Sequence, residues 1–415
     1  MPRYVLIGNS AAALAAVDGI RRRDGQGDIT IINREEGPAY SRVALPYFVA
    51  GELGGDDLLI RRLPDYARVG VKLLDGERVR AVDPEAKRVE LASGKRIEFE
   101  KLLIATGSET VVPPIRGLAQ VPHTFLWTLE DAVAMKEAAQ KAESAVVIGG
   151  GFIGMLAAEA LRKLRIKLTI VEVEPILLPQ LLDEPGGRLF LGAVKDEGVT
   201  VKTGSMVDAL ARNGENIEVT LGGGERFPVD MVVVATGVKP NLSCLGDGAV
   251  ATGRGVVVNQ FLQTSRPDIY AAGDVAESKD FLSDERAVHA IWPTAIDQGR
   301  AAGANMSGAR AAYPGSLGMN VVGLFGVTLA QIGRFREGPG DDVKLLSRGD
   351  TGLYRKVVVD GNGTLVGALY LGDETGASEM GVIHSAVKRR EKWRGFEEGR
   401  PPKFSYAGVV HRVPG

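Results

Sequence analysis

The sequence predicts an α/β fold with two Rossmann-like dinucleotide-binding domains and a third, α+β domain at the C-terminal end. Two glycine-rich turns, at Gly8 and at Gly149, each follow a short apolar strand and precede an Ala/Leu-rich helix. A dinucleotide-binding turn requires this setting. Each unit is closed downstream by the tripeptide Ala-Thr-Gly, starting at Ala105 and at Ala235. One chain is therefore expected to hold two dinucleotides.

Length and composition fit an enzyme of two or three domains. The 415 residues are enough for several domains that each bury a core. With 50 Lys and Arg against 52 Asp and Glu, the net charge indicates neither nucleic acid nor a membrane surface as a partner. We expect no signal peptide and no membrane span, and there is a single cysteine, Cys244. These features predict a cytoplasmic protein without an internal disulfide.

The first unit begins with a β-rich strand that leads into the Gly8 turn. Strands are expected at 4–7, 29–32 and 102–105, with a helix at 11–23. After Pro240 the chain is expected to return to this unit, because the strand at 268–275 has no sheet of its own. A helix at 295–305 follows it. The predicted first domain is therefore 1–117 together with 243–312.

The second unit and the C-terminal region follow the same reading. A helix at 129–142 leads into a predicted second domain, 118–242, with strands at 145–148, 168–171 and 231–235. From about Tyr313 the pattern changes to strands at 342–346, 354–359 and 364–370 and a helix at 377–389. This pattern predicts an α+β domain over 313–390. The tail, 391–415, shows no evident fold.

The second turn matches a dinucleotide site better than the first. In such turns one glycine makes the tight turn, the next lets the backbone reach the pyrophosphate, and the third lets the helix pack on the strand. The second turn has all three, as Gly149, Gly151 and Gly154. In the first turn only Gly8 is glycine, and Ser10 and Ala13 take the other places. That turn either binds a dinucleotide or serves packing alone.

Specificity for the adenosine ribose depends on the residue that ends the second strand of each unit. In the second unit this residue is Glu172. Its carboxylate can accept hydrogen bonds from both ribose hydroxyls and would repel a 2′-phosphate, so NADH is favoured over NADPH. In the first unit the candidate is Glu35 or Glu36. The alternative for these two is a pair of solvated surface acids.

These motifs, together with Ala272-Gly273-Asp274, resemble those of the FAD-dependent pyridine nucleotide oxidoreductases with two dinucleotide domains. This superfamily includes glutathione reductase, rubredoxin and ferredoxin reductases, and the flavin portion of NADH-nitrite reductase. The resemblance covers about residues 1–386 and implies a glutathione reductase-like fold. It implies FAD in the first unit and NAD in the second, an arrangement typical of a relay from a nicotinamide to a flavin.

The resemblance also implies the residues that hold the cofactors. For FAD they are Gly8, Ser10, Ala11, Ala13, Glu35, Arg42, Thr106, Gly107, Gly273, Asp274 and Ala295. For NAD they are Gly149, Gly151, Phe152, Ile153, Gly154, Glu172, Thr236 and Gly237. Asp274 is expected to hydrogen-bond the ribityl chain, and the helix at Ala295 to point its positive end at the flavin pyrimidine. A plain surface turn of helix is the alternative for 298–300.

Three positions depart from the family pattern. Val43 stands where coenzyme A-disulfide reductases carry a cysteine, so thiol chemistry at the flavin is not expected. Tyr47 and Leu156 stand where many relatives have a Lys–Glu pair beside the flavin. Cys244 is interpreted as a packing residue rather than a nucleophile.

Hydride transfer needs no protein acid or base, because the cofactors carry the chemistry. No residue is therefore assigned as catalytic with certainty. Phe152 either covers the flavin until the nicotinamide displaces it or is an ordinary apolar residue at a helix start. No metal site is expected, because the four histidines lack ligand spacing and are interpreted as structural or surface residues. They are His123, His289, His384 and His411.

The acceptor is expected to be an iron–sulfur protein or subunit, because the chain has no iron–sulfur cysteines of its own. The first turn, the loop 40–47 and the stretch 318–321 resemble NAD-coupling flavoprotein subunits of phenylglyoxylate or tungsten-containing aldehyde oxidoreductases. The alternatives are a free-standing rubredoxin or ferredoxin reductase, a nitrite reductase component, or an NADH-responsive flavin-containing interaction protein. The basic run 388–394 either docks an acidic partner or is a solvated helix end. The sequence leaves two oligomeric states open, a hetero-oligomer and a homodimer.

Overall fold

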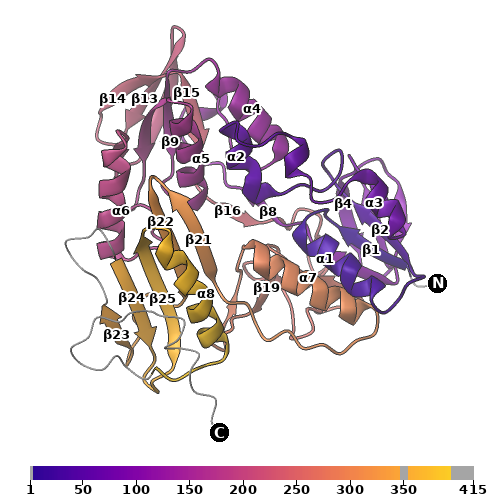
Figure 1. Cartoon of the computed structure of the whole chain (residues 1–415). Coiled ribbons are helices and arrows are strands. Elements are labelled where there is room, and N and C mark those ends of the chain that lie inside the picture. The colour runs from indigo at the N-terminus through magenta and orange to yellow at the C-terminus, as the bar shows by residue number, and fades with distance from the viewer. Residues whose placement is uncertain (1–2, 346–353, 394–415) are drawn as a thin grey trace. The chain divides into compact units, whose positions relative to one another are not determined.

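The computed structural model of the chain describes residues 3–345 and 354–393, and Figure 1 shows their course. These residues form two compact units. Unit 1 consists of the chain up to Val111 together with Trp127–Val133 and Gly237–Leu317. Unit 2 consists of Val112–Leu126, Ala134–Thr236 and the residues from Gly318 onward. The predicted tail lies outside the described residues from 394 onward.

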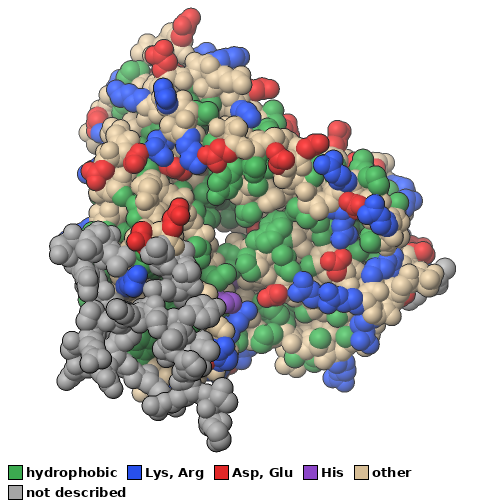
Figure 2. Space-filling view, in the orientation of Figure 1, with side chains coloured by type: hydrophobic (Ala, Val, Ile, Leu, Met, Phe, Trp, Pro, Cys, Tyr) green, Lys and Arg blue, Asp and Glu red, His purple; other side chains and the backbone are tan. Residues whose placement is uncertain are grey.

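The visible face of both units carries charged side chains of both signs. Figure 2 shows basic and acidic side chains interspersed over the visible face of the described residues. Within 3–345 and 354–393, no helix has the length and apolarity that a membrane span requires.

Unit 1 is built on a five-stranded parallel sheet in the order β18-β7-β1-β2-β3. These strands are β1 Arg3–Ile7, β2 Asp28–Ile32, β3 Val71–Leu74, β7 Lys101–Ile104 and β18 Ile269–Ala271. Ile269 pairs with Leu102 across β18 and β7, so the prediction that the chain returns to this sheet is confirmed. The inner strands are rich in Ile, Leu and Val and almost wholly buried, as is usual for a parallel sheet covered on both faces.

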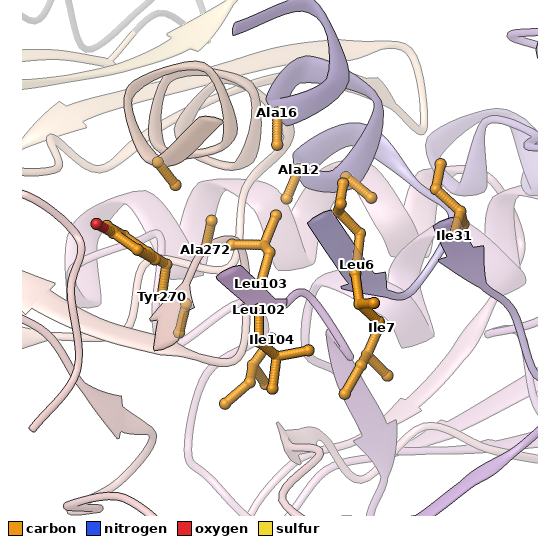
Figure 3. Packing of buried hydrophobic residues seen from close by; sticks show 14 of the residues in the cluster. Leu6, Ile7, Ala12, Ala16, Ile31, Leu102, Leu103, Ile104, Tyr270 and Ala272 are labelled. Carbon is orange, nitrogen blue, oxygen red and sulfur yellow. The ribbon is translucent and has the colours of Figure 1, made fainter. Parts of the chain in front are cut away.

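Two helices pack closely on one face of this sheet, namely α1 (Ala11–Arg21) and α7 (Trp292–Met306). Ala12 and Ala16 of α1 are labelled in Figure 3. An added Cβ at Gly299 would lie 2.1 Å from the carbonyl oxygen of Ala12, and one at Gly303 would lie 2.1 Å from that of Ala16. Only small residues permit this approach of two helix backbones. The alternative of a plain surface turn is therefore wrong for Gln298 and Gly299, although Arg300 is exposed.

Shorter elements complete unit 1. A three-stranded antiparallel meander consists of β4 Val79–Asp83, β5 Arg88–Leu91 and β6 Arg96–Glu98. The other strands are β8 Ser108–Thr110, β16 Val238–Pro240, β17 Val256–Val257, β19 Ala276–Lys279 and β20 Arg286–Ala287. The helical segments are η1 Arg42–Ala44, α2 Leu45–Val49, η2 Asp56–Leu58 and α3 Leu63–Arg68. The helix α4, Leu129–Ala139, begins in unit 1 and continues into unit 2.

Unit 2 repeats the same plan with a four-stranded parallel sheet in the order β11-β10-β9-β15. Its strands are β9 Ser144–Ile148, β10 Lys167–Val171, β11 Thr200–Lys202 and β15 Met231–Val234. The helices α5 Phe152–Lys163 and α6 Glu184–Asp196 follow β9 and β10 in the chain. A meander of β12 Val207–Asn213, β13 Asn216–Leu221 and β14 Arg226–Val229 completes this part, with η3 Leu118–Gln120.

The C-terminal part of unit 2 is an antiparallel sheet in the order β21-β22-β25-β24-β23, with α8 packed on β22 and β25 (Figure 1). Its elements are β21 Met319–Leu324, β22 Val327–Gly333, β23 Asp342–Leu345, β24 Tyr354–Val359, β25 Leu365–Gly372 and α8 Thr375–Lys388. The predicted α+β character is confirmed. The β21–β22 hairpin was not among the predicted strands. Its tip, Phe325, is buried and packs edge-on against Phe190 of α6.

Candidate functional site

The first glycine turn, between β1 and α1, is shaped by its backbone. Gly8 has φ +117°, and a Cβ there would lie 2.1 Å from the carbonyl oxygen of Ala105, so this position requires glycine. The Gly8 amide donates to Ile32 O at 2.8 Å, which fixes the turn against the end of β2. The side chain of Ser10, the N-cap residue, makes no capping hydrogen bond. The first amides of α1, at Ala11 to Ala13, are therefore suited to bind an anion.

The second turn, between β9 and α5, has the same construction, with glycine at two tightly packed positions. Gly149 has φ +109°, and its added Cβ would lie 2.3 Å from Ala235 O. At Gly154 the added Cβ would lie 2.0 Å from Gly149 O. At Gly151, by contrast, it would meet nothing within 4 Å, so this backbone is open to an approaching group. The Gly149 amide donates to Val171 O at 2.8 Å, which repeats the contact in the first turn.

The two Ala-Thr-Gly segments lie behind these turns. Ala105 and Ala235 supply the carbonyls that approach Gly8 and Gly149. Thr106 Oγ1 donates to Asn241 O at 2.7 Å. Gly107 and Gly237 both have positive φ, at +68° and +109°, as sharp turns at strand ends require. The structure therefore brings each predicted closing turn against its glycine turn.

Glu172 lies beside the second turn, as the sequence places it. It is 6% exposed and follows the last residue of β10. Its Oε2 accepts from the Gly150 amide at 2.5 Å, and its Oε1 accepts from the Glu174 amide at 2.8 Å. A carboxylate has about four acceptor positions. The side chain is thus held in place with acceptor capacity left for ribose hydroxyls.

Of the two acids in the first unit, Glu35 belongs to a network and Glu36 is exposed. Glu35 accepts from Tyr40 Oη at 2.5 Å and forms an ion pair with Arg42. Arg42 also donates to Trp127 O at 2.6 Å. The alternative of two solvated acids is therefore wrong for Glu35. Tyr40 and Trp127 take part in this network and were not predicted as site residues. Tyr40 lies in the loop 40–47 but was not singled out there, and Trp127 takes part through its backbone carbonyl.

Asp274 follows β18 and contacts Ser108, the residue directly after the first Ala-Thr-Gly segment. It accepts from Ser108 Oγ at 2.8 Å, and burial raises the pKa of its carboxyl above the usual value. The preceding Gly273 donates its amide to Gln298 Oε1 at 2.8 Å. The Nε2 of Gln298, which is 1% exposed, donates in turn to Ser278 Oγ at 3.0 Å. These bonds hold the Ala-Gly-Asp segment to α7.

The start of α7 differs from the prediction. The helix begins at Trp292 instead of Ala295, because Pro293 takes a first-turn position that its fixed φ favours. The Ala295 amide donates to Ile291 O at 3.1 Å within the helix. Ala295 therefore offers no free helix-start amide. Pro293 has no N–H, so Trp292 and Thr294 carry the amides that precede this first intrahelical bond.

Asn9, inside the first turn, has a polar group that the protein does not satisfy. The side chain is 9% exposed, and its Oδ1 accepts from Tyr66 Oη at 2.8 Å. Its buried Nδ2 has no hydrogen-bond partner among the described residues. A buried donor without an acceptor costs about 1–3 kcal/mol. The turn therefore fits a ligand that brings an acceptor, such as the pyrophosphate and ribose of a dinucleotide.

Among the remaining predicted positions, His289 is linked to the Gln298 network through Ser316 and Ser278. Val43 is 57% exposed and Tyr47 is 42% exposed on the η1–α2 segment. Cys244 is buried, and burial raises the pKa of its thiol to about 11. His289 contacts Ser316 Oγ at 2.6 Å, and burial lowers the pKa of its imidazole. These features fit the predicted structural roles of the cysteine and of this histidine.

Of the other histidines, His123 is held by a backbone contact and a ring contact. The Nδ1 of His123 lies 3.0 Å from Val121 O, and its ring packs edge-on against Phe125. His411 lies outside the described residues. Within the described part of the chain, no three His, Cys, Asp or Glu side chains gather to hold a metal ion.

The comparisons with known proteins agree with this geometry. The model of the family described as pyridine nucleotide-disulphide oxidoreductase matches residues 2–299. The NADH-dependent phenylglyoxylate dehydrogenase subunit epsilon of Aromatoleum evansii is 33% identical, over 94% of this chain and 92% of the relative. The NADH-rubredoxin oxidoreductase of Clostridium acetobutylicum is 31% identical, over 74% of this chain and 75% of the relative. The structure of an NAD-dependent persulfide reductase from A. fulgidus has a TM-score of 0.87 and 27% identity, over 94% of this chain and 77% of that one.

Proposed function

Because the chain belongs to the pyridine nucleotide-disulphide oxidoreductase family, we propose that it is an FAD-dependent NADH:acceptor oxidoreductase serving an iron–sulfur or other redox protein. The observation that carries the proposal is the presence of two dinucleotide turns in one chain. Both turns hold the same amide-to-strand hydrogen bond at 2.8 Å, and both lead into a helix whose first amides lack a side-chain cap. Such helix starts bind pyrophosphate.

Unit 1 fits FAD. The helix start at Ala11 would receive the pyrophosphate, the unpaired Asn9 amide supports a bound acceptor, and Glu35 lies at the ribose position. Asp274 is held by Ser108 for the ribityl chain. Bound FAD would supply the exchange between an electron pair and single electrons. The protein then positions the cofactor and supplies the electrostatic field around it.

Unit 2 fits NADH. Gly151 leaves the backbone open, and the amides of Phe152 and Ile153 begin α5. Glu172 is held by Gly150 where a 2′-phosphate would meet a carboxylate. This arrangement supports NADH over NADPH.

We also propose that the flavin works without a redox-active disulfide. The sequence has one cysteine, and its burial and raised pKa oppose thiolate formation. Val43 occupies the position at which related disulfide reductases are expected to carry cysteine. A lone, inert thiol also fits the proposed cytoplasmic setting.

The relatives support a protein partner. One is named as a subunit of phenylglyoxylate dehydrogenase and another as a rubredoxin oxidoreductase. We therefore propose that this chain works as the flavoprotein subunit of a multi-subunit oxidoreductase, with a free-standing reductase as the alternative. The basic run after α8 supports docking only weakly, because Arg389 pairs with Glu391 and Lys392 donates to Asn362 O.

Reoxidation of the reduced flavin tests the proposal. The protein is reduced anaerobically with one equivalent of NADH and mixed with rubredoxin, a [2Fe–2S] ferredoxin or coenzyme A disulfide. We expect an iron–sulfur carrier to reoxidise the flavin quickly and the disulfide to leave it reduced. Fast reoxidation by the disulfide would contradict the thiol-free mechanism. Slow reoxidation by every carrier would favour an NADH-responsive interaction protein instead.

A further inference from the structure

A loop in unit 2, residues 174–183, connects the second dinucleotide turn with the C-terminal sheet. It starts two residues after Glu172 and ends at Asp183, the N-cap residue of α6. The Oδ1 of Asp183 accepts from the Gly186 amide at 3.1 Å. The loop is therefore anchored to α6 at its far end.

The middle of the loop holds the turn directly. The Leu178 amide donates to Gly150 O at 2.9 Å. Leu177 is fully buried, and its Cδ2 would lie 2.5 Å from a Cβ at Gly150. Leu178 has φ +52°, a conformation that costs a leucine energy and persists only where its surroundings impose it. The position of Gly150 thus depends on how firmly this loop is fixed.

The C-terminal sheet fixes the other side of the loop. Lys356, which is 6% exposed, donates from Nζ to Asp183 Oδ2 at 2.9 Å. Tyr354 Oη donates to the same oxygen at 2.7 Å. Arg336 donates to Pro179 O. Lys356 is the buried partner of this pair, and because a buried charge that loses its counter-ion is left uncompensated, the Lys356–Asp183 contact resists opening.

We propose that Lys356, Tyr354 and Arg336 are positioning residues for NADH. By fixing Asp183 and Pro179 they hold the loop, and through Leu178 the loop holds Gly150 in the conformation that receives the pyrophosphate. The inference rests on the proposed function, in which the second turn binds NADH. It assigns to the C-terminal sheet a part in nucleotide affinity that needs no contact with the nucleotide.

The test uses the FAD-loaded full-length protein and ADP-ribose, which carries the adenosine and pyrophosphate of NADH without a nicotinamide. Calorimetry measures its dissociation constant for the wild type, R336A, R336K and K356M. We expect R336A and K356M to weaken binding about three- to tenfold, which lies within the effects known for mutations of residues that do not touch the ligand. R336K should restore most of the affinity, because lysine can still donate to Pro179 O. FAD content should not change.

The control is R389A, which removes the exposed arginine that follows α8 and pairs with Glu391 and Ser385 instead of with the loop. It should leave affinity for ADP-ribose unchanged. Stopped-flow reduction by NADH adds a second measurement: in R336A the NADH concentration at half-maximal rate should rise while the limiting rate stays the same. Because Arg336 is exposed, R336A should fold even if K356M does not.

The outcomes separate the inference from the function. If the wild type binds ADP-ribose and R336A binds it equally well, the positioning role is wrong and the proposed function stands. If R336K is as weak as R336A, the hydrogen bond to Pro179 is not the cause and the inference also fails. If the wild type itself does not bind ADP-ribose, the assignment of the second turn to NADH fails first.

Discussion

Gly299 of α7 lies directly against the carbonyl of Ala12 in the first turn of α1, where an added Cβ would be 2.1 Å from the oxygen. The contact joins the returning segment of the chain to the helix whose first amides face the proposed FAD pyrophosphate. Any side chain at position 299 must move α1 or α7. The geometry of the proposed flavin site therefore depends on a glycine packed between two helices.

The variant G299A should destabilise unit 1 and weaken FAD retention. Forcing a methyl group between two helix backbones costs about 1–3 kcal/mol. We expect a lower melting temperature and a lower flavin-to-protein ratio after purification. The matched control is G192A in α6, where an added Cβ meets nothing within 4 Å and alanine favours the helix. If G299A kept a full complement of FAD and normal stability, the tight packing would be refuted.

Asn9 should contribute to FAD affinity through its unpaired Nδ2. We expect N9A to raise the dissociation constant of FAD about tenfold, because the variant loses roughly one hydrogen bond to the cofactor. Titration of the apoprotein with FAD, followed by flavin fluorescence, measures it. The comparison variant Y66F removes the partner of Oδ1 and the acceptor of the Ala39 amide but leaves Nδ2 in place, and it should have a smaller effect on FAD affinity. Equal affinities of N9A and wild type would show that Nδ2 does not face the cofactor.

Glu172 should set the choice between NADH and NADPH. In E172A the ribose loses its acceptors and the 2′-phosphate loses a repelling charge. The apparent affinity for NADH should fall about tenfold and the preference over NADPH should shrink. Steady-state kinetics with both nucleotides measure the ratio, and E174A, which removes a neighbouring exposed acid, serves as the control. If E172A had the same ratio of apparent affinities for NADH and NADPH as the wild type, Glu172 would not lie at the ribose site.

Asp268 should stabilise the return of the chain to the first sheet in a pH-dependent way. Burial alone raises the pKa of its carboxyl, but hydrogen bonds from Lys101 and Lys87, both at 2.5 Å, outweigh burial and hold the pKa below its usual value. A depressed carboxyl pKa stabilises the fold above the unfolded pKa, near 4, and this stabilisation disappears as the pH falls through the folded pKa.

The variant D268N should therefore lose about 1 kcal/mol of stability at pH 7 and much less near pH 3. Denaturant unfolding at several pH values gives the comparison. D247N, at an exposed aspartate, is the control. A loss that is constant across this pH range would show that the ion pairs do not carry the effect.

Cys244 should be inert. Its burial and raised pKa leave almost no thiolate at pH 7, so the native protein should react with iodoacetamide far more slowly than the unfolded protein. The variant C244A should keep the rate of flavin reduction by NADH. If a folded C244A lost turnover, the thiol of Cys244 would take part in the reaction, and the proposal would be wrong.

Much of the fold follows from local patterns in the sequence. The strands around Gly8 and Gly149 are short apolar runs next to glycine turns, and both parallel sheets were predicted from them. The strand at Ile269 was correctly assigned to the first sheet. It has no neighbouring strand to pair with in its own part of the chain, so it had to join a sheet formed earlier. The β21–β22 hairpin was missed, since its tip is Phe325-Gly326 and lacks the usual turn pairs.

The site was less predictable than the fold. Ser108 and Gln298 hold Asp274 and Gly273 through contacts over long sequence separations, which no local spacing indicates. Asn9 lay inside a recognised motif, but the unsatisfied Nδ2 becomes visible only with its surroundings. The start of α7 was misplaced because Pro293 was not taken as a first-turn residue.

The most direct measurement is an anaerobic titration of the purified protein with NADH and, in parallel, with NADPH, while the flavin absorbance is followed. We predict that FAD copurifies, that about one equivalent of NADH bleaches it, and that NADPH does so poorly. If no flavin is bound, or if neither nucleotide reduces it, the chain is not an FAD-dependent NADH oxidoreductase.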